Sequence, residues 1–254
     1  MVGRAGGVKH RATLREEFML YFVRFSLIAL YTVFWGAIAT VAAPFSGEAI
    51  VWVARNWIRW IFATCGVRVE ASGLEHVRAT KTAVYMSNHQ SVLDIGAIVE
   101  SLPISWRFVA KKELTYIPFF GWALGLSDQV VIDRGNRRRA VESLRRAAER
   151  VRGGVNVIIF PEGTRSPDGS LRAFKSGGFH LAIDAQVPVI PITVSGSFQL
   201  TPKRSLQVRS GTVKVVYGAP IPTTGLTARE RELLKDRVAD AIRASYDAKL
   251  QLAR

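Results

Sequence analysis

The sequence predicts an α/β fold in which a mixed sheet is flanked by helices and follows an N-terminal two-helix membrane anchor. From residue 67 onward, short β-type runs alternate with helical patterns, as expected for a sheet covered by helices. Before them, residues 25–47 have no charged side chain. A chain of 254 residues can hold one sizeable domain and an appendage. We therefore expect a membrane-anchoring helical hairpin in residues 1–66 and an α/β domain in residues 67–254.

The uncharged run of residues 25–47 is long enough to form a membrane segment. At about 1.5 Å per residue, it can cross a hydrocarbon core of about 30 Å. A cleavable signal peptide is the alternative, because basic residues precede the run, but such a peptide has a shorter apolar region. Arg24 and the adjacent Glu16 and Glu17 also fit a signal peptide poorly. We therefore interpret the run as part of an anchor.

A second apolar stretch, residues 49–65, follows the helix breakers Pro44 and Gly47 and differs in kind. Arg55 and Arg59 are four positions apart and share one helical face, with three tryptophans close by. Because tryptophan favours the headgroup boundary, this composition suits a helix in the plane of the membrane interface. Basic residues flank the apolar run on both sides, so they give no orientation. We expect a hairpin that enters one leaflet and returns, with a single transmembrane span as the alternative.

Hydrophobic periodicity locates the elements of the α/β domain. Strands are expected over residues 83–86, 106–110, 130–132, 155–160, 187–194 and 212–217, and helices over residues 137–152 and 178–185. A last helix is expected to open at Thr227, because Glu230 stands three residues later and completes a capping box. Leu234, Val238 and Ile242 would then form the buried stripe of that helix.

The composition is both basic and apolar. Hydrophobic residues make up 48% of the chain, and 35 basic against 20 acidic side chains give a formal net charge of +15. This charge favours an anionic membrane surface or an acidic carrier protein as a partner, although a solvated basic face explains it equally well. We expect no nucleic acid partner, because no basic stripe interleaved with aromatic residues stands out. The single cysteine, Cys65, allows no disulfide and no Cys/His metal-binding spacing, so we expect a reducing compartment, no metal and no cofactor.

Two polar clusters follow apolar runs, where strands are expected to end. The first is residues 88–94, NHQSVLD, in which Asp94 stands five positions after His89. On one continuous helix the two side chains would point about 140° apart, so they can meet only if the backbone turns between them. Ser91 is a good N-cap, which places His89 on a turn and Asp94 in the first turn of a helix. The carboxylate would then orient the imidazole as a general base for an alcohol.

Other interpretations of this first cluster stay open. The spacing from Ser91 to Asp94 is close to a capping box, so Asp94 can act as a helix cap alone, and Asn88 can be a simple turn residue. No nucleophile is obvious. Ser87 and Ser91 are the hydroxyls nearest to His89 in the sequence, but one is expected to end a strand and the other to cap a helix. We therefore favour direct attack by a substrate alcohol over a covalent enzyme intermediate.

The second cluster is residues 160–166, FPEGTRS. Gly163 permits a tight backbone, Thr164 offers a hydroxyl, and Arg165 offers a planar fork of donors that fits a phosphate. Glu162 cannot bind a phosphate directly and is expected to orient Arg165 or another cation. A strand-end turn with a surface ion pair is the alternative. Two other strand ends would add cations, at Lys111 with Lys112 and at Asp133 with Arg134.

These clusters, together with three further blocks, resemble the glycerolipid acyltransferases. The blocks, in order, are NHQSVLD, then Lys111, Lys112, Glu113 and Leu114 with Ile117, Pro118 and Gly121, then Val131, Ile132, Asp133 and Arg134, then FPEGTRS, then Val187, Pro188, Val189, Ile190 and Pro191. Their order over about residues 83–194 makes the resemblance highly specific. The sequence looks like the 1-acyl-glycerol-3-phosphate (lysophosphatidic acid) acyltransferases, and the N-terminal two-helix pattern resembles that family's membrane anchor.

The resemblance implies a reaction and a role for each site residue. A fatty acyl group would move from acyl-CoA or acyl-acyl carrier protein to the 2-hydroxyl of a lysophospholipid acceptor, 1-acyl-glycerol 3-phosphate, and give phosphatidic acid for phospholipid biosynthesis. His89 would deprotonate the hydroxyl, and Asp94 would orient His89. The glycerol phosphate would be held by Glu162, Gly163, Thr164 and Arg165, with Arg134 and Lys111 near the phosphate or the path of the acyl chain.

The expected location is the cytoplasmic face of the inner (plasma) membrane, with the protein membrane-associated, because the anchor would bring the site to its lipid pool. Two alternatives stay open. The acceptor can be glycerol 3-phosphate or another lysolipid, or the chain can be a non-catalytic membrane module that binds anionic lipid. The His89–Asp94 pair disfavours the second alternative, because pure binding needs no base.

Overall fold

The computed structural model describes residues 5–42, 47–116, 121, 129–133, 135, 137–202, 205 and 207–252. Its helices are α1 (Ala5–Ala42), α2 (Gly47–Cys65), α3 (Leu74–Ala79), α4 (Leu93–Ser101), α6 (Arg137–Arg152), α7 (Gly177–Ala185), α8 (Ser197–Leu200), α9 (Arg231–Ser245) and α10 (Lys249–Leu252), with 3-10 turns η1 (Lys112–Tyr116) and η2 (Ala228–Glu230). Its strands are β1 (Val67–Ser72), β2 (Val84–Ser87), β3 (Arg107–Lys111), β4 (Val130–Ile132), β5 (Val157–Ile159), β6 (Val189–Ser195) and β7 (Gly211–Tyr217). The elements predicted from the sequence are present, with small shifts at their ends.

The strands in the described part of the chain form one seven-stranded sheet, in the order β1-β7-β6-β2-β5-β3-β4. The five strands from β6 to β4 are parallel, whereas β7 runs antiparallel to β6 and parallel to β1. The prediction of a mixed sheet is therefore confirmed. Because the five parallel strands all end at one edge of the sheet, the residues that follow them gather there.

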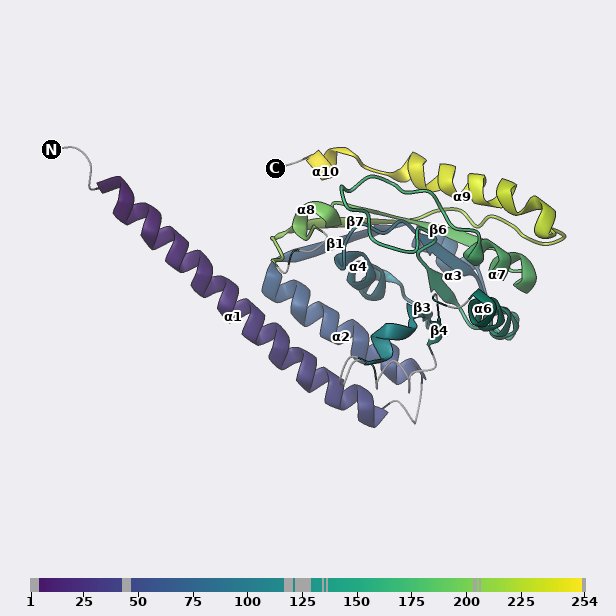
Figure 1. Cartoon of the computed structure of the whole chain (residues 1–254), viewed down its shortest axis with the longest axis horizontal. Coiled ribbons are helices and arrows are strands. Elements are labelled where there is room, and N and C mark those ends of the chain that lie inside the picture. Colours follow the sequence, from purple (N-terminus) through teal and green to yellow (C-terminus); the bar gives the residue numbers. More distant parts are fainter. Residues whose placement is uncertain are drawn as a thin grey trace.

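Helices cover both faces of the sheet (Figure 1). The helices α6, α7 and α9 lie over one face, and α2 and α4 lie over the other. A hydrophobic core lies between the sheet and the helices on each face. In β2, Val84 and Met86 point into the core under α6, α7 and α9, and Tyr85 points into the core under α2 and α4. A central strand that is buried on both faces has continuous apolar sequence instead of alternating sequence, which is why the predicted strands appeared as short apolar runs.

The N-terminal helices α1 and α2 lie side by side, and α2 joins the pair to the sheet domain (Figure 1). Trp35 and Ala39 of α1 pack with Ile50 and Val53 of α2 in a small core of their own. On its other side, α2 packs against α4. A Cβ atom at Gly96 of α4 would lie 2.7 Å from the ring of Phe62 in α2, so glycine at this position permits the close approach of the two helices.

Arg55 also fastens α2 to α4. Its Nη2 donates to the carbonyl oxygen of Leu102 at 2.6 Å and its Nε donates to that of Val99 at 3.4 Å. These carbonyl groups belong to the carboxyl end of α4, where no backbone donor of the same helix can reach them. Arg59, expected to share a helical face with Arg55, is exposed. Of the two arginines expected at the membrane interface, Arg55 therefore binds another helix of the protein.

Large apolar side chains stand exposed along α1, namely Met19, Leu20, Phe22, Val23, Phe25, Leu30, Val33, Phe34 and Val41. Its segment Met19–Ala42 is the one helix in the described part of the chain that is long and apolar enough to cross a membrane. Contiguous apolar surface of this kind usually marks a protein or membrane contact. The helix α1 is accordingly a candidate membrane anchor.

The capping box predicted at Thr227 is present. The backbone N–H of Thr227 donates to Oε2 of Glu230 at 2.8 Å, and the box opens η2, which leads into α9. The stripe of Leu234, Val238 and Ile242 on α9 is fully buried, as predicted. This stripe packs the helix α9 against one face of the sheet.

Candidate active site

The two polar clusters follow the ends of neighbouring strands. Residues 88–94 follow β2 and residues 160–166 follow β5, and these strands are adjacent and parallel. On the other side of β2, strand β6 ends at Ser195 and leads to Ser197 at the start of α8. We name residues 88–92 the His89 loop and residues 160–175 the Arg165 loop. Both open at the carboxyl edge of the sheet, where α/β folds commonly bind ligands.

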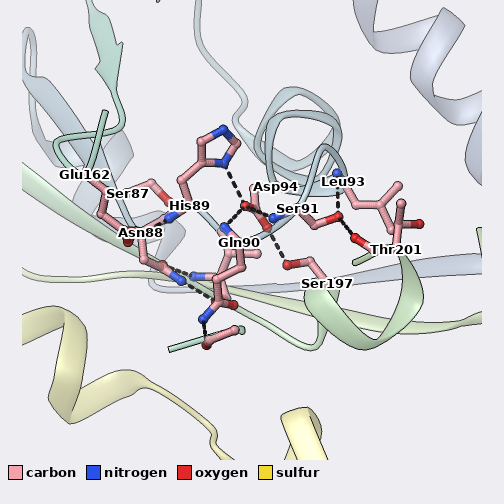
Figure 2. A network of polar contacts seen from close by, with 12 residues as sticks. Ser87, Asn88, His89, Gln90, Ser91, Leu93, Asp94, Glu162, Ser197 and Thr201 are labelled. Atoms are coloured by element: carbon pink, nitrogen blue, oxygen red, sulfur yellow. Dashed lines mark hydrogen bonds and ion pairs between the residues drawn. The ribbon is translucent and has the colours of Figure 1, made fainter. Parts of the chain in front are cut away.

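His89 and Asp94 form the predicted pair (Figure 2). Nδ1 of His89 lies 2.9 Å from Oδ2 of Asp94, the imidazole side chain is 13% exposed, and the carboxylate is fully buried. An ionised carboxylate only accepts hydrogen bonds, so Nδ1 donates and Nε2 retains its lone pair. The backbone turn expected at Ser91 is what brings the two side chains together.

Asp94 also holds the backbone of the His89 loop. Its Oδ2 accepts from the backbone N–H groups of Gln90 at 2.6 Å and Ser91 at 2.8 Å. Its Oδ1 accepts from the hydroxyl of Ser197 (Figure 2). Asp94 therefore holds both the imidazole and the backbone turn before α4, whose N-cap residue, Val92, has no side-chain cap. Four donors satisfy the two buried oxygens.

Asn88 ties the start of the same loop to β6. Its Nδ2 donates to the carbonyl oxygen of Val194 at 2.8 Å, and its Oδ1 accepts from the N–H of Val194 at 2.8 Å. The side chain is fully buried. The side chain of Asn88 pairs with the backbone of β6 at the point where β2 ends. Asn88 is therefore more than a simple turn residue, which was one interpretation of the sequence.

An aromatic row leads from β3 to His89. The rings of Trp106 and Phe108 lie 4.9 Å apart, those of Phe108 and Phe160 lie 6.1 Å apart, and those of Phe160 and His89 lie 4.1 Å apart between centroids. The last pair is stacked, so Phe160 restricts the imidazole to one plane. The row gives one side of the His89 ring an apolar wall.

Glu162 lies behind the His89 loop and is 2% exposed. Its Oε1 accepts from the backbone N–H of His89 at 3.0 Å, so Glu162 orients the His89 loop, a role that the sequence analysis did not expect. Burial raises the pKa of Glu162 to about 7, against the opposing hydrogen bond from His89. The charge of Asp94 acts in the same direction as burial.

The Arg165 loop contacts the His89 loop through its backbone. The N–H of Ser166 donates to the carbonyl oxygen of His89 at 2.8 Å. Gly163 has φ of 75°, a left-handed conformation that side-chain-bearing residues rarely adopt. Thr164 is exposed and Arg165 is partly buried. The fold thus places an arginine and a hydroxyl in the segment that touches the backbone of His89.

The other predicted cations lie farther along the sheet edge. Lys111 ends β3, on the far side of β5 from β2, and its Nζ lies 2.9 Å from Oε1 of Glu113. Nζ of Lys112 lies 3.5 Å from Oδ2 of Asp133. Arg134 lies outside the described residues. The structure therefore brings together His89, Asp94, Glu162 and the Arg165 loop. Lys111 forms an ion pair with Glu113 instead.

Sequence reasoning missed Ser197, Phe160 and Asn88 as supports of the site. Asn88 and Phe160 belong to the two clusters, so their positions beside polar residues were the available signal. Ser197 stands 103 positions from Asp94 and no motif marks it. Across the described residues, no group of three or more His, Cys, Asp or Glu side chains is arranged to hold a metal ion.

Comparison with known proteins gives the class. The family model for acyltransferases matches residues 68–195, just over half of the 254-residue chain. The chain shares its fold with the 1-acyl-sn-glycerophosphate (LPA) acyltransferase PlsC from Thermotoga maritima, whose crystal structure is known. The two structures superimpose with a TM-score of 0.77 at 27% sequence identity, over 93% of this chain and 96% of that one. The chain therefore belongs to the acyltransferase family.

Curated relatives narrow the class further. A 1-acyl-sn-glycerol-3-phosphate acyltransferase of Limnanthes alba is 31% identical over 233 residues, which are 89% of this chain and 79% of that protein. The human 1-acyl-sn-glycerol-3-phosphate acyltransferase alpha is 38% identical over 174 residues, which are 68% of this chain and 62% of that protein. This chain is an O-acyltransferase, as the sequence predicted.

Proposed function

We propose that this enzyme transfers a fatty acyl group from an acyl thioester to the 2-hydroxyl of 1-acyl-glycerol 3-phosphate and so makes phosphatidic acid. Relatives that match most of the chain are named for this acceptor. The hydrogen bond between Nδ1 of His89 and Oδ2 of Asp94, at the strand edge, is the observation that supports the chemistry. It leaves Nε2 able to take a proton from an alcohol.

In the proposed reaction, Nε2 of His89 takes the proton of the 2-hydroxyl while the hydroxyl oxygen attacks the carbonyl carbon of the thioester. The tetrahedral intermediate collapses, the C–S bond breaks, and the leaving thiolate takes the proton back from the imidazolium. Asp94 keeps the ring oriented and stabilises the imidazolium. A positioned base of this kind contributes about 10² to 10⁴ in rate.

Direct attack by the acceptor fits the environment of the two nearby serines. Ser87 donates to the carbonyl oxygen of Asn88 at 3.0 Å, and Ser91 donates to that of Thr201 at 2.7 Å. Both side chains are fully buried, so an acyl chain would have to displace packed structure to reach them. This arrangement supports a reaction without a covalent enzyme intermediate.

The acceptor phosphate is assigned to the Arg165 loop. Arg165 and Thr164 supply a guanidinium and a hydroxyl, which are the donors that suit a phosphate. The turn at Gly163, with its φ of 75°, lets these donors follow the strand end directly. Lys111 and Arg134 would add positive charge along the strand edge, and Glu162 acts on the substrate indirectly, by holding the backbone of His89.

The N-terminal region, residues 1–66, is proposed to anchor the α/β domain of residues 67–254 at the cytoplasmic face of the inner membrane. The exposed apolar side chains of α1, together with Trp52 and Trp60 of α2, suit a hairpin that enters one leaflet. Acyl-CoA and acyl-acyl carrier protein are both anionic, so either donor is compatible with a net charge of +15.

A panel of acceptors tests the proposal. The purified enzyme should acylate 1-acyl-glycerol 3-phosphate faster than glycerol 3-phosphate or other lysolipids, and preference for another acceptor would refute the assignment. His89→Ala should abolish turnover while anionic vesicles still bind the protein, whereas full activity would remove the mechanism. His76→Ala serves as the matched control, because His76 lies in α3, apart from both loops.

A further inference from the structure

The segment that follows α9 returns to the active site. The hydroxyl of Tyr246, the first residue after α9, donates to the carbonyl oxygen of Gly169 in the Arg165 loop at 2.8 Å. The side-chain Nε2 of Gln90, the neighbour of His89, donates to the same carbonyl and to the hydroxyl oxygen of Tyr246. We name Gln90, Gly169 and Tyr246 the C-terminal clasp.

The clasp joins three parts of the chain that are distant in sequence. Gln90 belongs to the His89 loop, Gly169 to the Arg165 loop, and Tyr246 to the C-terminal segment. The Arg165 loop is thus attached at two points close together, because the N–H of Ser166 already donates to the carbonyl oxygen of His89 at 2.8 Å. Two attachments fix both the position and the orientation of a loop, whereas one attachment permits rotation.

The chemical state of Tyr246 suits this role. Burial raises the pKa of its hydroxyl, and the charges of Asp94, Glu162 and Asp168 raise it further against the hydrogen bond from Gln90. The hydroxyl therefore keeps its proton and donates to Gly169 at neutral pH. The same hydroxyl oxygen accepts from Gln90, so the hydroxyl of Tyr246 both donates and accepts within the clasp.

We propose that Tyr246 is a positioning residue for acyl transfer, which sets the distance between the base on the His89 loop and the donors on the Arg165 loop. One acceptor must reach both loops, with its hydroxyl at His89 and its phosphate at Arg165. The few bonds of a glycerol phosphate fix that span, so a loop shift of about 1 Å weakens binding or misaligns the hydroxyl. The inference rests on the proposed function, because it assigns the acceptor phosphate to the Arg165 loop.

Tyr246 lies beyond residues 68–195, the stretch that matches the acyltransferase family model. The sequence blocks that resemble the family end at Pro191, so they assign no function to the C-terminal segment. The clasp gives this segment a function, because Tyr246 contacts both active-site loops from outside the stretch that matches the family model.

Tyr246→Phe tests the inference, since it removes the hydroxyl and keeps the ring. The loss of one or two hydrogen bonds should raise KM for 1-acyl-glycerol 3-phosphate about three- to tenfold. KM for the acyl donor should stay within about twofold of the wild-type value, because the proposal assigns only the acceptor to the Arg165 loop. Tyr217→Phe is the matched control. The buried Tyr217 hydroxyl lies 2.8 Å from Oγ of Ser101, at the opposite end of α4 from Asp94, and its loss should change neither KM.

Gln90→Leu opens the clasp from the other side. If the three groups act as a unit, the double variant should raise the acceptor KM no further than the stronger single variant does. The inference is overturned if Tyr246→Phe leaves the acceptor KM unchanged, or if it raises both KM values alike. Failure of the proposed function is a different result, because the wild type itself would then not acylate 1-acyl-glycerol 3-phosphate. The same comparison would then use the phosphate-bearing acceptor that the wild type prefers.

Discussion

The phenyl ring of Phe160 stacks on the imidazole of His89, with ring centroids 4.1 Å apart and an interplanar angle of 24°. Two residues later, Glu162 accepts from the backbone N–H of His89 at 3.0 Å. The second polar cluster therefore holds both the ring and the backbone of the first. An aromatic face attracts a cation, so Phe160 would favour the imidazolium that His89 forms in the proposed reaction.

Replacing Phe160 with leucine should slow acyl transfer. Leucine keeps an apolar side chain but removes the aromatic face, which is worth about 0.5–2 kcal/mol to a cation, or about two- to thirtyfold in kcat. Phe108→Leu is the control, since Phe108 contacts Phe160 and lies one ring farther from His89. An unchanged kcat in Phe160→Leu would contradict this role.

Removing the hydroxyl of Ser197 should impair the base through Asp94. In Ser197→Ala, Oδ1 of Asp94 loses its donor and stays buried, which costs about 1–3 kcal/mol, and kcat should fall about tenfold. Thr193→Val is the matched control. Thr193 is also buried, but its Oγ1 donates to the carbonyl oxygen of Ile242 in α9 at 3.3 Å. Equal kcat values for the two variants would show that Ser197 has only a structural part.

The buried carboxyl of Glu162 should make stability depend on pH. Burial raises its pKa from 4.5 to about 7, so folding favours the protonated form. This contribution is fully present below about pH 4.5 and is lost as the pH rises through about 7. In Glu162→Gln the side chain cannot ionise, so the Tm difference between variant and wild type should grow in favour of the variant from pH 5 to pH 8. Thermal unfolding at several pH values measures it, and a constant difference would refute the prediction.

Arg55 should stabilise the junction between the anchor and the α/β domain. Arg55→Met keeps much of the side-chain volume but leaves the carbonyl groups of Val99 and Leu102 without their donor, so the free energy of unfolding should fall by about 1–3 kcal/mol. Arg59→Met, on the exposed side of the same helix, should leave it nearly unchanged. Thermal unfolding in detergent compares them, and equal losses would show that Arg55 contributes only charge.

Features that depend on neighbouring residues could be predicted from the sequence. Helix α6 and strand β4 have the predicted bounds, since each follows from the spacing of its own apolar residues. The capping box at Thr227 and the turn between His89 and Asp94 are also local. The contacts of Asp94 with His89 and with the backbone of Ser91 are local as well, because both partners lie within five positions of it.

Contacts that depend on the order of strands could not be predicted. Ser197 reaches Asp94 because β6 lies beside β2, and nothing near Ser197 in the sequence distinguishes it from another serine. Tyr246 meets Gln90 only after α9 has packed along the sheet domain, 156 positions later. Arg55 was expected on a helix at the membrane interface, because its partner in α4 lies 44 positions away in the sequence and could not be identified there.

The helix α4 has Asp94 in its first turn, and its last carbonyl groups accept from Arg55 of α2. With nine residues, it is about 13 Å long. The helix α2 and the carboxylate of Asp94 thus contact opposite ends of one short helix. A fragment cut to remove α1 and α2 would lose the contacts at one end of α4, so such a fragment is a poor substitute for the intact enzyme in kinetic work.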